Sequence, residues 1–167
     1  MSRPAIAQPV PQMPGLRVAL VVSTYHDDIT SRLATGALDA LEAAGVSAAD
    51  VARLEVPGAY EIPFGARTAA ASGRVDAVVC LGCLIKGETP HFDYIASAVS
   101  HGIMQASLAH GVPMAFGVLT TNSLEEAEAR VPEGPGNKGY EAASAAVTMA
   151  WLAQQWQADG SRQGSEG

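Results

Sequence analysis

Short apolar runs alternate with longer helical patterns along this chain, and that alternation restricts the possible folds more than any other feature. Stretches long enough to hold a helix separate the runs, and a strand–helix–strand unit favours parallel pairing with a right-handed crossover. The sequence therefore predicts an α/β protein, a three-layer α/β/α sandwich around a four-stranded parallel sheet. Four runs have the length and the Val- and Leu-rich composition of strands: Leu16–Ser23, Val51–Val56, Ala77–Ile85 and Pro113–Leu119.

The segments between these runs carry the signals of helix beginnings and ends. Asp28 is predicted to cap the first helix and Gly45 to end it, while Pro63 fits the first turn of the second. The capping-box pattern Ser123-Leu124-Glu125-Glu126 predicts a short helix. The main helices are expected to contain Ile29–Leu41, Ile62–Ser72, Ile95–Ala106 and a last segment from about Lys138 to Trp156.

The 167 residues are enough for one domain with a substantial core, which we place at residues 15–157. Residues 1–14 contain four prolines and little periodicity, so we expect a disordered or extended segment. Residues 158–167 are polar and rich in Gly and Ser, which predicts a flexible tail.

The formal net charge of −7 argues against a nucleic-acid partner and against an anionic membrane surface. No apolar run approaches the ~20 residues of a membrane helix, and no signal-peptide pattern is present. The cytoplasm is therefore the expected compartment.

Cys80 and Cys83 form a Cys-x-x-Cys pair, a spacing found in redox and zinc sites. A zinc site would need a second pair of ligands at a matching spacing, and none occurs. Both cysteines lie in the apolar run Ala77–Ile85, so we expect buried, unreactive thiols and no metal site.

Ligands of parallel α/β sheets bind beyond the carboxyl ends of the strands. The chain places most of its reactive side chains at these ends, so the corresponding segments are expected to converge on one site. They are Tyr25-His26, Val56–Glu61, Lys86–Asp93 and Thr120–Asn122.

Lys86–Asp93 has the richest chemistry of these segments. Gly87 allows close approach of the backbone, Thr89 offers a hydroxyl, and amides ahead of the next helix would favour an anion such as phosphate. His91 could move protons near neutral pH. An ordinary turn with a helix cap would explain the same residues, and the segment lacks the phosphate-loop pattern Gly-x-x-x-x-Gly-Lys-[Ser/Thr].

Four segments taken together resemble the lumazine synthase family of riboflavin biosynthesis, over roughly residues 15–157. They are Val56–Pro63, Gly82–Tyr94, Phe116–Asn122 and Gly136–Gly139. The resemblance implies a flavodoxin-like sheet and an enzyme that joins 5-amino-6-(D-ribitylamino)uracil to 3,4-dihydroxy-2-butanone 4-phosphate. It also implies that phosphate and water leave, that 6,7-dimethyl-8-ribityllumazine forms, and that neither a cofactor nor a metal takes part.

The resemblance also assigns roles to single residues. It makes His91 the proton-transfer residue, Tyr25 the aromatic that stacks on the pyrimidine and Arg130 the phosphate-binding arginine. The family usually has Phe or Trp followed by Asn where this chain has Tyr25-His26. The implied substrate-binding residues are Tyr25, His26, Gly58, Ala59, Glu61, Leu84, Ile85, Glu88, Thr89, Phe116 of a neighbouring subunit, Arg130 and Lys138.

Family members form pentamers with sites between adjacent subunits, and some pentamers assemble into larger shells, so we expect a homopentamer. A decamer and a 60-subunit shell remain open at this point. A non-catalytic ligand-binding protein and a structural shell protein are the alternative functions. The pairing of His91 with Arg130 favours the enzyme, because neither alternative needs both residues.

Overall fold

A computed structural model describes residues 9–163 of the chain. Its centre is a four-stranded, all-parallel sheet in the order β2-β1-β3-β4, as the alternation of the sequence predicted. The strands pair in a continuous register, with Val18 opposite both Val51 and Ala77, and Leu84 opposite Thr120. The strands are β1 (Val18–Ser23), β2 (Val51–Val56), β3 (Ala77–Ile85) and β4 (Met114–Thr121).

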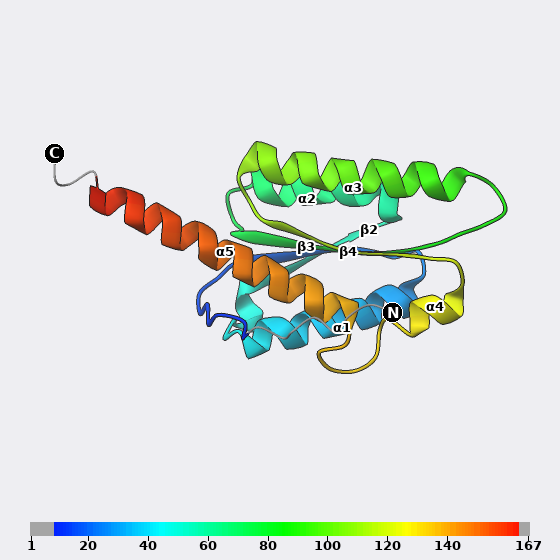
Figure 1. Cartoon of the computed structure of the whole chain (residues 1–167), viewed down its shortest axis with the longest axis horizontal. Helices are drawn as coiled ribbons and strands as arrows, with labels where there is room; N and C mark the ends of the chain where they lie inside the picture. The colour runs from blue at the N-terminus through cyan, green and yellow to red at the C-terminus, as the bar shows by residue number, and fades with distance from the viewer. Residues whose placement is uncertain (1–8, 164–167) are drawn as a thin grey trace.

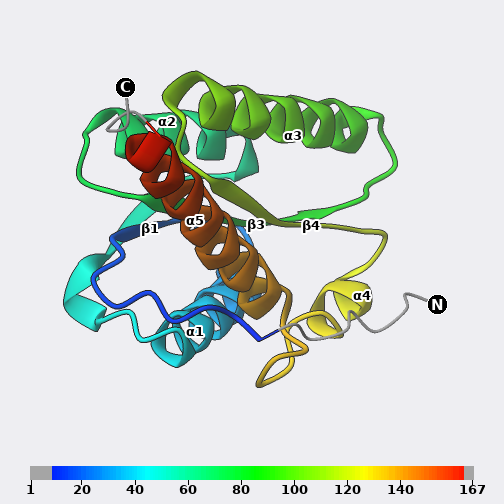
Figure 2. The same cartoon turned by 60° about the vertical axis from the view of Figure 1, so that its left-hand side comes forward.

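Helices cover both faces of the sheet and give the predicted three layers (Figure 1). Helices α2 (Ile62–Ala71) and α3 (His91–His110) lie on one face, and α1 (Asp27–Ala43) and α5 (Lys138–Gln163) lie on the other. The short α4 (Leu124–Glu128) follows β4, and 3-10 turns at Ala48–Asp50 and Ala59–Glu61 flank β2. Figure 2 shows α5 crossing the sheet, and Figure 1 shows its C-terminal part extending beyond it.

The core explains why the run Ala77–Ile85 shows no polar alternation. Val79 and Leu81 pack with α1 and α5, while Val78 and Cys80 pack with α2 and α3, so successive side chains of β3 enter opposite layers. A strand covered on both faces needs apolar residues at every position.

Several boundaries differ from the expectations by one or two residues, and others differ by more or in their physical origin. The N-cap of α1 is His26, which has a left-handed backbone at φ 58°, and not Asp28. Asp28 lies in the first turn, where its negative charge interacts favourably with the helix dipole. Helix α3 begins at His91, before its apolar periodicity starts. Strand β4 continues to Thr121, and α5 continues past Trp156 to Gln163.

The two ends of the chain are described only in part. Residues 9–14 take no regular structure, but they are held on the body, because Met13 is buried and its N–H donates to the carbonyl of Ala44 at 2.8 Å. Residues 1–8 and 164–167 lie outside the described residues.

Both cysteines are buried in β3, as predicted. Burial raises the pKa of the Cys80 thiol to about 12 and that of Cys83 to about 11, which keeps both thiols protonated and unreactive at neutral pH. Within residues 9–163, no group of His, Cys, Asp and Glu side chains could hold a metal ion, and no helix is long and apolar enough to cross a membrane.

Candidate active site

A pocket of about 550 Å³, called here the strand-end pocket, lies where β1, β2 and β3 end. Its walls come from three of the four segments predicted to converge, whereas no residue of Thr120–Asn122 lines it. The lining residues are Tyr25, His26, Gly58, Ala59, Tyr60, Glu61, Cys83, Leu84, Ile85, Gly87, Thr89, His91, Phe92 and Ile95.

Backbone hydrogen bonds fix the loop after β1 against the loop after β2. The N–H of Thr24 donates to the carbonyl of Val56 at 2.8 Å, and the N–H of Tyr25 donates to that of Pro57 at 3.1 Å. The rings of Tyr25 and His26 pack edge to face, with their centroids 4.7 Å apart. Because 68% of Tyr25 is exposed, its ring is available to a ligand and is not part of the core.

Hydrogen bonds between Glu61 and Gly58 hold the loop after β2 in a tight turn. Glu61 accepts a hydrogen bond from the N–H of Gly58 through Oε2 at 3.0 Å, and its own N–H donates to the Gly58 carbonyl at 3.2 Å. A Cβ at position 58 would approach Oε2 to 3.1 Å, so glycine leaves room for this closure. Glu61 is exposed and keeps accepting capacity for a hydroxyl-bearing ligand.

The loop after β3 leads directly into α3. The N–H of Lys86 donates to the carbonyl of Thr121 at 2.8 Å, which ties the loop to the end of β4. Thr89 and His91 line the strand-end pocket, whereas Glu88 is exposed on the same loop without lining it. His91 is the first residue of a 20-residue helix, so the positive end of the helix dipole lies beside it and favours an anion there.

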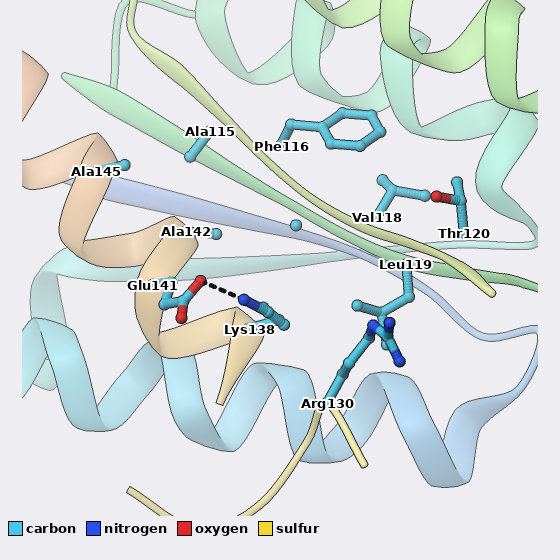
Figure 3. A pocket seen from close by; sticks show the side chains of 11 residues that line it. Ala115, Phe116, Val118, Leu119, Thr120, Arg130, Lys138, Glu141, Ala142 and Ala145 are labelled. Carbon is cyan, nitrogen blue, oxygen red and sulfur yellow. Dashed lines mark hydrogen bonds and ion pairs between the residues drawn. The ribbon is translucent and has the colours of Figure 1, made fainter. Parts of the chain in front are cut away.

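A second pocket of about 390 Å³, called here the edge pocket, lies along β4, the edge strand of the sheet (Figure 3). Lys138 reaches it with its Nζ atom 2.8 Å from Oε2 of Glu141, and Arg130 reaches it while Nη1 donates to the carbonyl of Glu126 at 2.7 Å. Phe116 is 47% exposed at its rim. The lining residues are Ala115, Phe116, Gly117, Val118, Leu119, Thr120, Arg130, Lys138, Glu141, Ala142 and Ala145.

The predicted site residues thus divide between two pockets of one chain. Tyr25, His91 and most of their predicted partners line the strand-end pocket, while Phe116, Arg130 and Lys138 line the edge pocket. No described residue lines both. One copy of the chain therefore does not bring Arg130 into the pocket that holds Thr89 and His91.

Several lining residues were not among the site residues predicted from the sequence. Glu141 forms an ion pair with Lys138, and their spacing of three residues on a helix could have indicated the pair. Phe92 and Ile95 follow His91 on α3 at a spacing that places them on one helix face. Tyr60 lies within Val56–Glu61, a segment predicted to converge on the site, although no role was assigned to it, and nothing in the pattern of Cys83 indicates a site.

The sheet is all-parallel, and the loops at its strand ends hold the imidazole of His91. A second pocket holds the cations of Arg130 and Lys138. This combination is typical of an α/β enzyme with a polar site suited to an anionic substrate. Residues 15–154 match the model of the 6,7-dimethyl-8-ribityllumazine synthase family. A protein of that name from Syntrophus aciditrophicus (strain SB) is 48% identical over 141 residues, which cover 84% of this chain and 92% of that protein. The chain belongs to the 6,7-dimethyl-8-ribityllumazine synthase family.

Membership confirms the resemblance drawn from the four sequence segments and establishes the reaction. The chain is a transferase of riboflavin biosynthesis. It condenses 5-amino-6-(D-ribitylamino)uracil with 3,4-dihydroxy-2-butanone 4-phosphate to 6,7-dimethyl-8-ribityllumazine and releases phosphate and water.

Proposed function

We propose that this condensation takes place in a composite site, in which the strand-end pocket of one copy faces the edge pocket of a neighbouring copy. One observation carries the proposal. The imidazole of His91 and the cations of Arg130 and Lys138 line separate pockets of the same chain. A ring of identical copies would supply every strand-end pocket with an edge pocket from the next copy.

The pyrimidine binds in the strand-end pocket. The exposed ring of Tyr25 stacks on it, and Leu84 and Ile85 at the end of β3 form the wall behind it. Glu61, together with the backbone at Gly58 and Ala59, binds the hydroxyls of the ribityl chain. His26, whose ring contacts that of Tyr25, lies beside the same substrate.

The phosphate binds where the two pockets meet. Thr89 and the amides at the start of α3 bind it from one copy, while Arg130 and Lys138 bind it from the other. The planar guanidinium of Arg130 can donate two parallel hydrogen bonds to phosphate oxygens. The carboxylate of Glu88 would repel phosphate, so we assign its contribution to the backbone amide.

The reaction needs proton transfers and close positioning of two substrates. The pyrimidine amine attacks the ketone carbon, and loss of water leaves an imine. Loss of the proton on C3 then expels phosphate from C4, which takes the electrons of the carbon–oxygen bond, and the resulting enol becomes a ketone at C3 with a methyl group at C4. Attack of the second nitrogen on this new ketone closes the ring with loss of another water. His91 carries protons between these groups, and much of the acceleration comes from holding both substrates together.

We also propose a homopentamer as the unit that forms these sites. Its support is the number of large apolar side chains left exposed on α2, α3 and α5 of the isolated chain, since monomers rarely expose so much apolar surface. A decamer or a 60-subunit shell would preserve the same contacts. The cytoplasmic location stays a prediction. The exposed apolar residues on these helices are Phe64, Tyr94, Met104, Leu108, Met149, Trp151, Leu152 and Trp156.

The assignment of the phosphate is tested by steady-state kinetics with both substrates, following lumazine absorbance and phosphate release. Arg130→Ala should raise the KM of the phosphorylated substrate by about 10- to 100-fold, the loss expected for one or two charge-assisted hydrogen bonds, and change that of the pyrimidine far less. Arg74→Ala, exposed in the turn between α2 and β3 and lining neither pocket, is the matched control and should change neither. Equal weakening of both substrates by Arg130→Ala would contradict the assigned role.

A further inference from the structure

Arg130 and Lys138 stand at the two ends of one loop. The N–H of Lys138 donates to the carbonyl of Arg130 at 3.0 Å, so the backbones of the two cationic residues meet where the loop closes. The residues between them include two prolines, and Gly134 has a φ of 84°. Val131 at the start of the loop packs in the core, but residues 132–136 are exposed or half-buried, so apolar packing holds the loop only at that end.

Asn137, which precedes Lys138, is the buried residue at the other end of the loop, with only 3% of it exposed. Its Nδ2 donates to the carbonyls of Arg32 in α1 and Pro132 in the loop, both at 3.0 Å. Its Oδ1 accepts from the N–H groups of Gly139 at 2.7 Å and Tyr140 at 3.4 Å, in the first turn of α5. An Asn side chain has two donors and one carbonyl oxygen with two lone pairs, so this amide uses its full capacity.

These four hydrogen bonds join three parts of the chain. They cap the beginning of α5, close the loop across Pro132, and tie both to α1, which lies 105 residues earlier in the sequence at Arg32. A fully satisfied amide in a buried position specifies one arrangement, because any displacement leaves buried polar groups without partners.

Two glycines make room for this arrangement. A Cβ at Gly36 of α1 would overlap Cγ and Oδ1 of Asn137, and a Cβ at Gly139 would overlap the carbonyl of Leu33. The contact between the two helices and the amide is therefore so close that no side chain fits at either position. The amide can occupy its place only while α1 presents a bare backbone to it.

We propose that Asn137 is a positioning residue that sets the separation and direction of Arg130 and Lys138, without contacting the substrate itself. The inference rests on the proposed role of these two cations in binding phosphate. Asn137 lines neither the strand-end pocket nor the edge pocket, and its polar atoms are fully used within the chain. Without it, the loop would have to be ordered when the phosphate binds, at a cost in conformational entropy.

The test measures both substrates in two variants, Asn137→Ala and Gly36→Ala. We expect the KM of the phosphorylated substrate to rise about tenfold, the effect of ~1.4 kcal/mol, while that of the pyrimidine stays within about twofold. Combined with Arg130→Ala, the Asn137→Ala change should raise the KM of the phosphorylated substrate by a smaller factor than it does alone, because the two changes remove a shared interaction. Where Asn137→Ala does not fold, Gly36→Ala decides by the same criteria.

Gln12→Ala is the matched control. Its amide also bonds a carbonyl of α1, that of Ala43 at 2.7 Å, but at the opposite end of the helix from Asn137. We expect the control to lower stability without changing the ratio of the two KM values. A purely structural role for Asn137 would give the same result, and that outcome would overturn the inference.

The controls also separate this inference from the proposed site. If Arg130→Ala itself leaves the KM of the phosphorylated substrate unchanged, the phosphate assignment fails and the positioning role falls with it. If Arg130→Ala raises that KM while Asn137→Ala and Gly36→Ala do not, the phosphate site stands and only the positioning role is wrong.

Discussion

Mixing His91→Ala with Arg130→Ala should restore activity if the site is shared between copies. The rates are compared with the phosphorylated substrate well below its wild-type KM, where Arg130→Ala alone keeps about 1–10% of the wild-type rate. His91→Ala damages the strand-end pocket and leaves the edge pocket intact, whereas Arg130→Ala does the reverse. In a mixed ring, some sites combine the strand-end pocket of an Arg130→Ala copy with the edge pocket of a His91→Ala copy. Such a site has the wild-type residues on both sides.

The size of the recovery follows from the arrangement alone. In an equal mixture with random order in the ring, each pocket is intact in half of the copies, so about one quarter of the sites have both pockets intact. The mixture should therefore reach about 25% of wild-type activity per chain, apart from the small residual activity of the two variants.

The assay unfolds the two variants together, refolds them, isolates rings that carry both of two different affinity tags, and follows lumazine formation. The matched control mixes His91→Ala with Tyr25→Ala, which damage the same pocket and should not complement each other. A mixture of His91→Ala and Arg130→Ala no more active than the mean of its parents, in rings shown to carry both tags, would refute the composite site.

Three further predictions concern catalysis and stability. His91→Gln should lower kcat by about 10²- to 10⁴-fold with little change in either KM, as expected for lost proton transfer, and an unchanged kcat would remove His91 from the mechanism. Gly139→Ala should lower the free energy of unfolding by about 1–3 kcal/mol in urea titrations, because its Cβ would overlap the Leu33 carbonyl; unchanged stability would contradict this close approach. Arg17 donates hydrogen bonds that hold the pKa of Asp76 below its usual range, so this stabilisation is full above about pH 4 and lost as the pH falls through the lower, folded-state value. Asp76→Asn should therefore destabilise the chain at pH 7 by roughly 0.5–1 kcal/mol and by less near pH 2, and a pH-independent difference would argue against this origin.

The fold could be predicted because burial leaves a direct mark on the sequence. Ala77–Ile85 matches β3 at both ends, since a strand covered on both faces is apolar throughout. The missed boundaries lack such a mark. His91 begins α3 with positions that show no apolar periodicity, and α5 continues past Trp156, where residues 157–160 are exposed.

The cap at His26 was missed for a different reason. A left-handed backbone at a residue other than glycine is uncommon, so the sequence favoured the carboxylate of Asp28 as the cap. The N–H groups of Thr24 and Tyr25 donate hydrogen bonds to the end of β2 and the loop after it, and these bonds fix the chain just before His26. That constraint comes from tertiary contacts, which residue preferences cannot show.

The candidate site likewise has one part whose position follows from the sequence and one part whose position does not. Topology predicted the strand-end pocket, because parallel strands bring Tyr25, Thr89 and His91 to one edge of the sheet wherever they occur in the sequence. No such rule places Arg130 and Lys138, which reach the side of β4 through a loop closed by Asn137. Their match to family motifs gave them a role, but only the structure shows that they line a separate pocket.

Because the two pockets are separate, each can form during folding of its own chain, before the chains assemble. The edge pocket is built within one chain, because the hydrogen bonds of Asn137 and the contact between Lys138 and Arg130 are all internal. In the proposed composite site, assembly then has only to bring two formed surfaces together. The cost of ordering the loop proposed to bind phosphate is met during folding, so under this proposal it does not weaken substrate binding. In this proposal, assembly brings the two pockets together, and the fold of each chain positions the residues within each pocket.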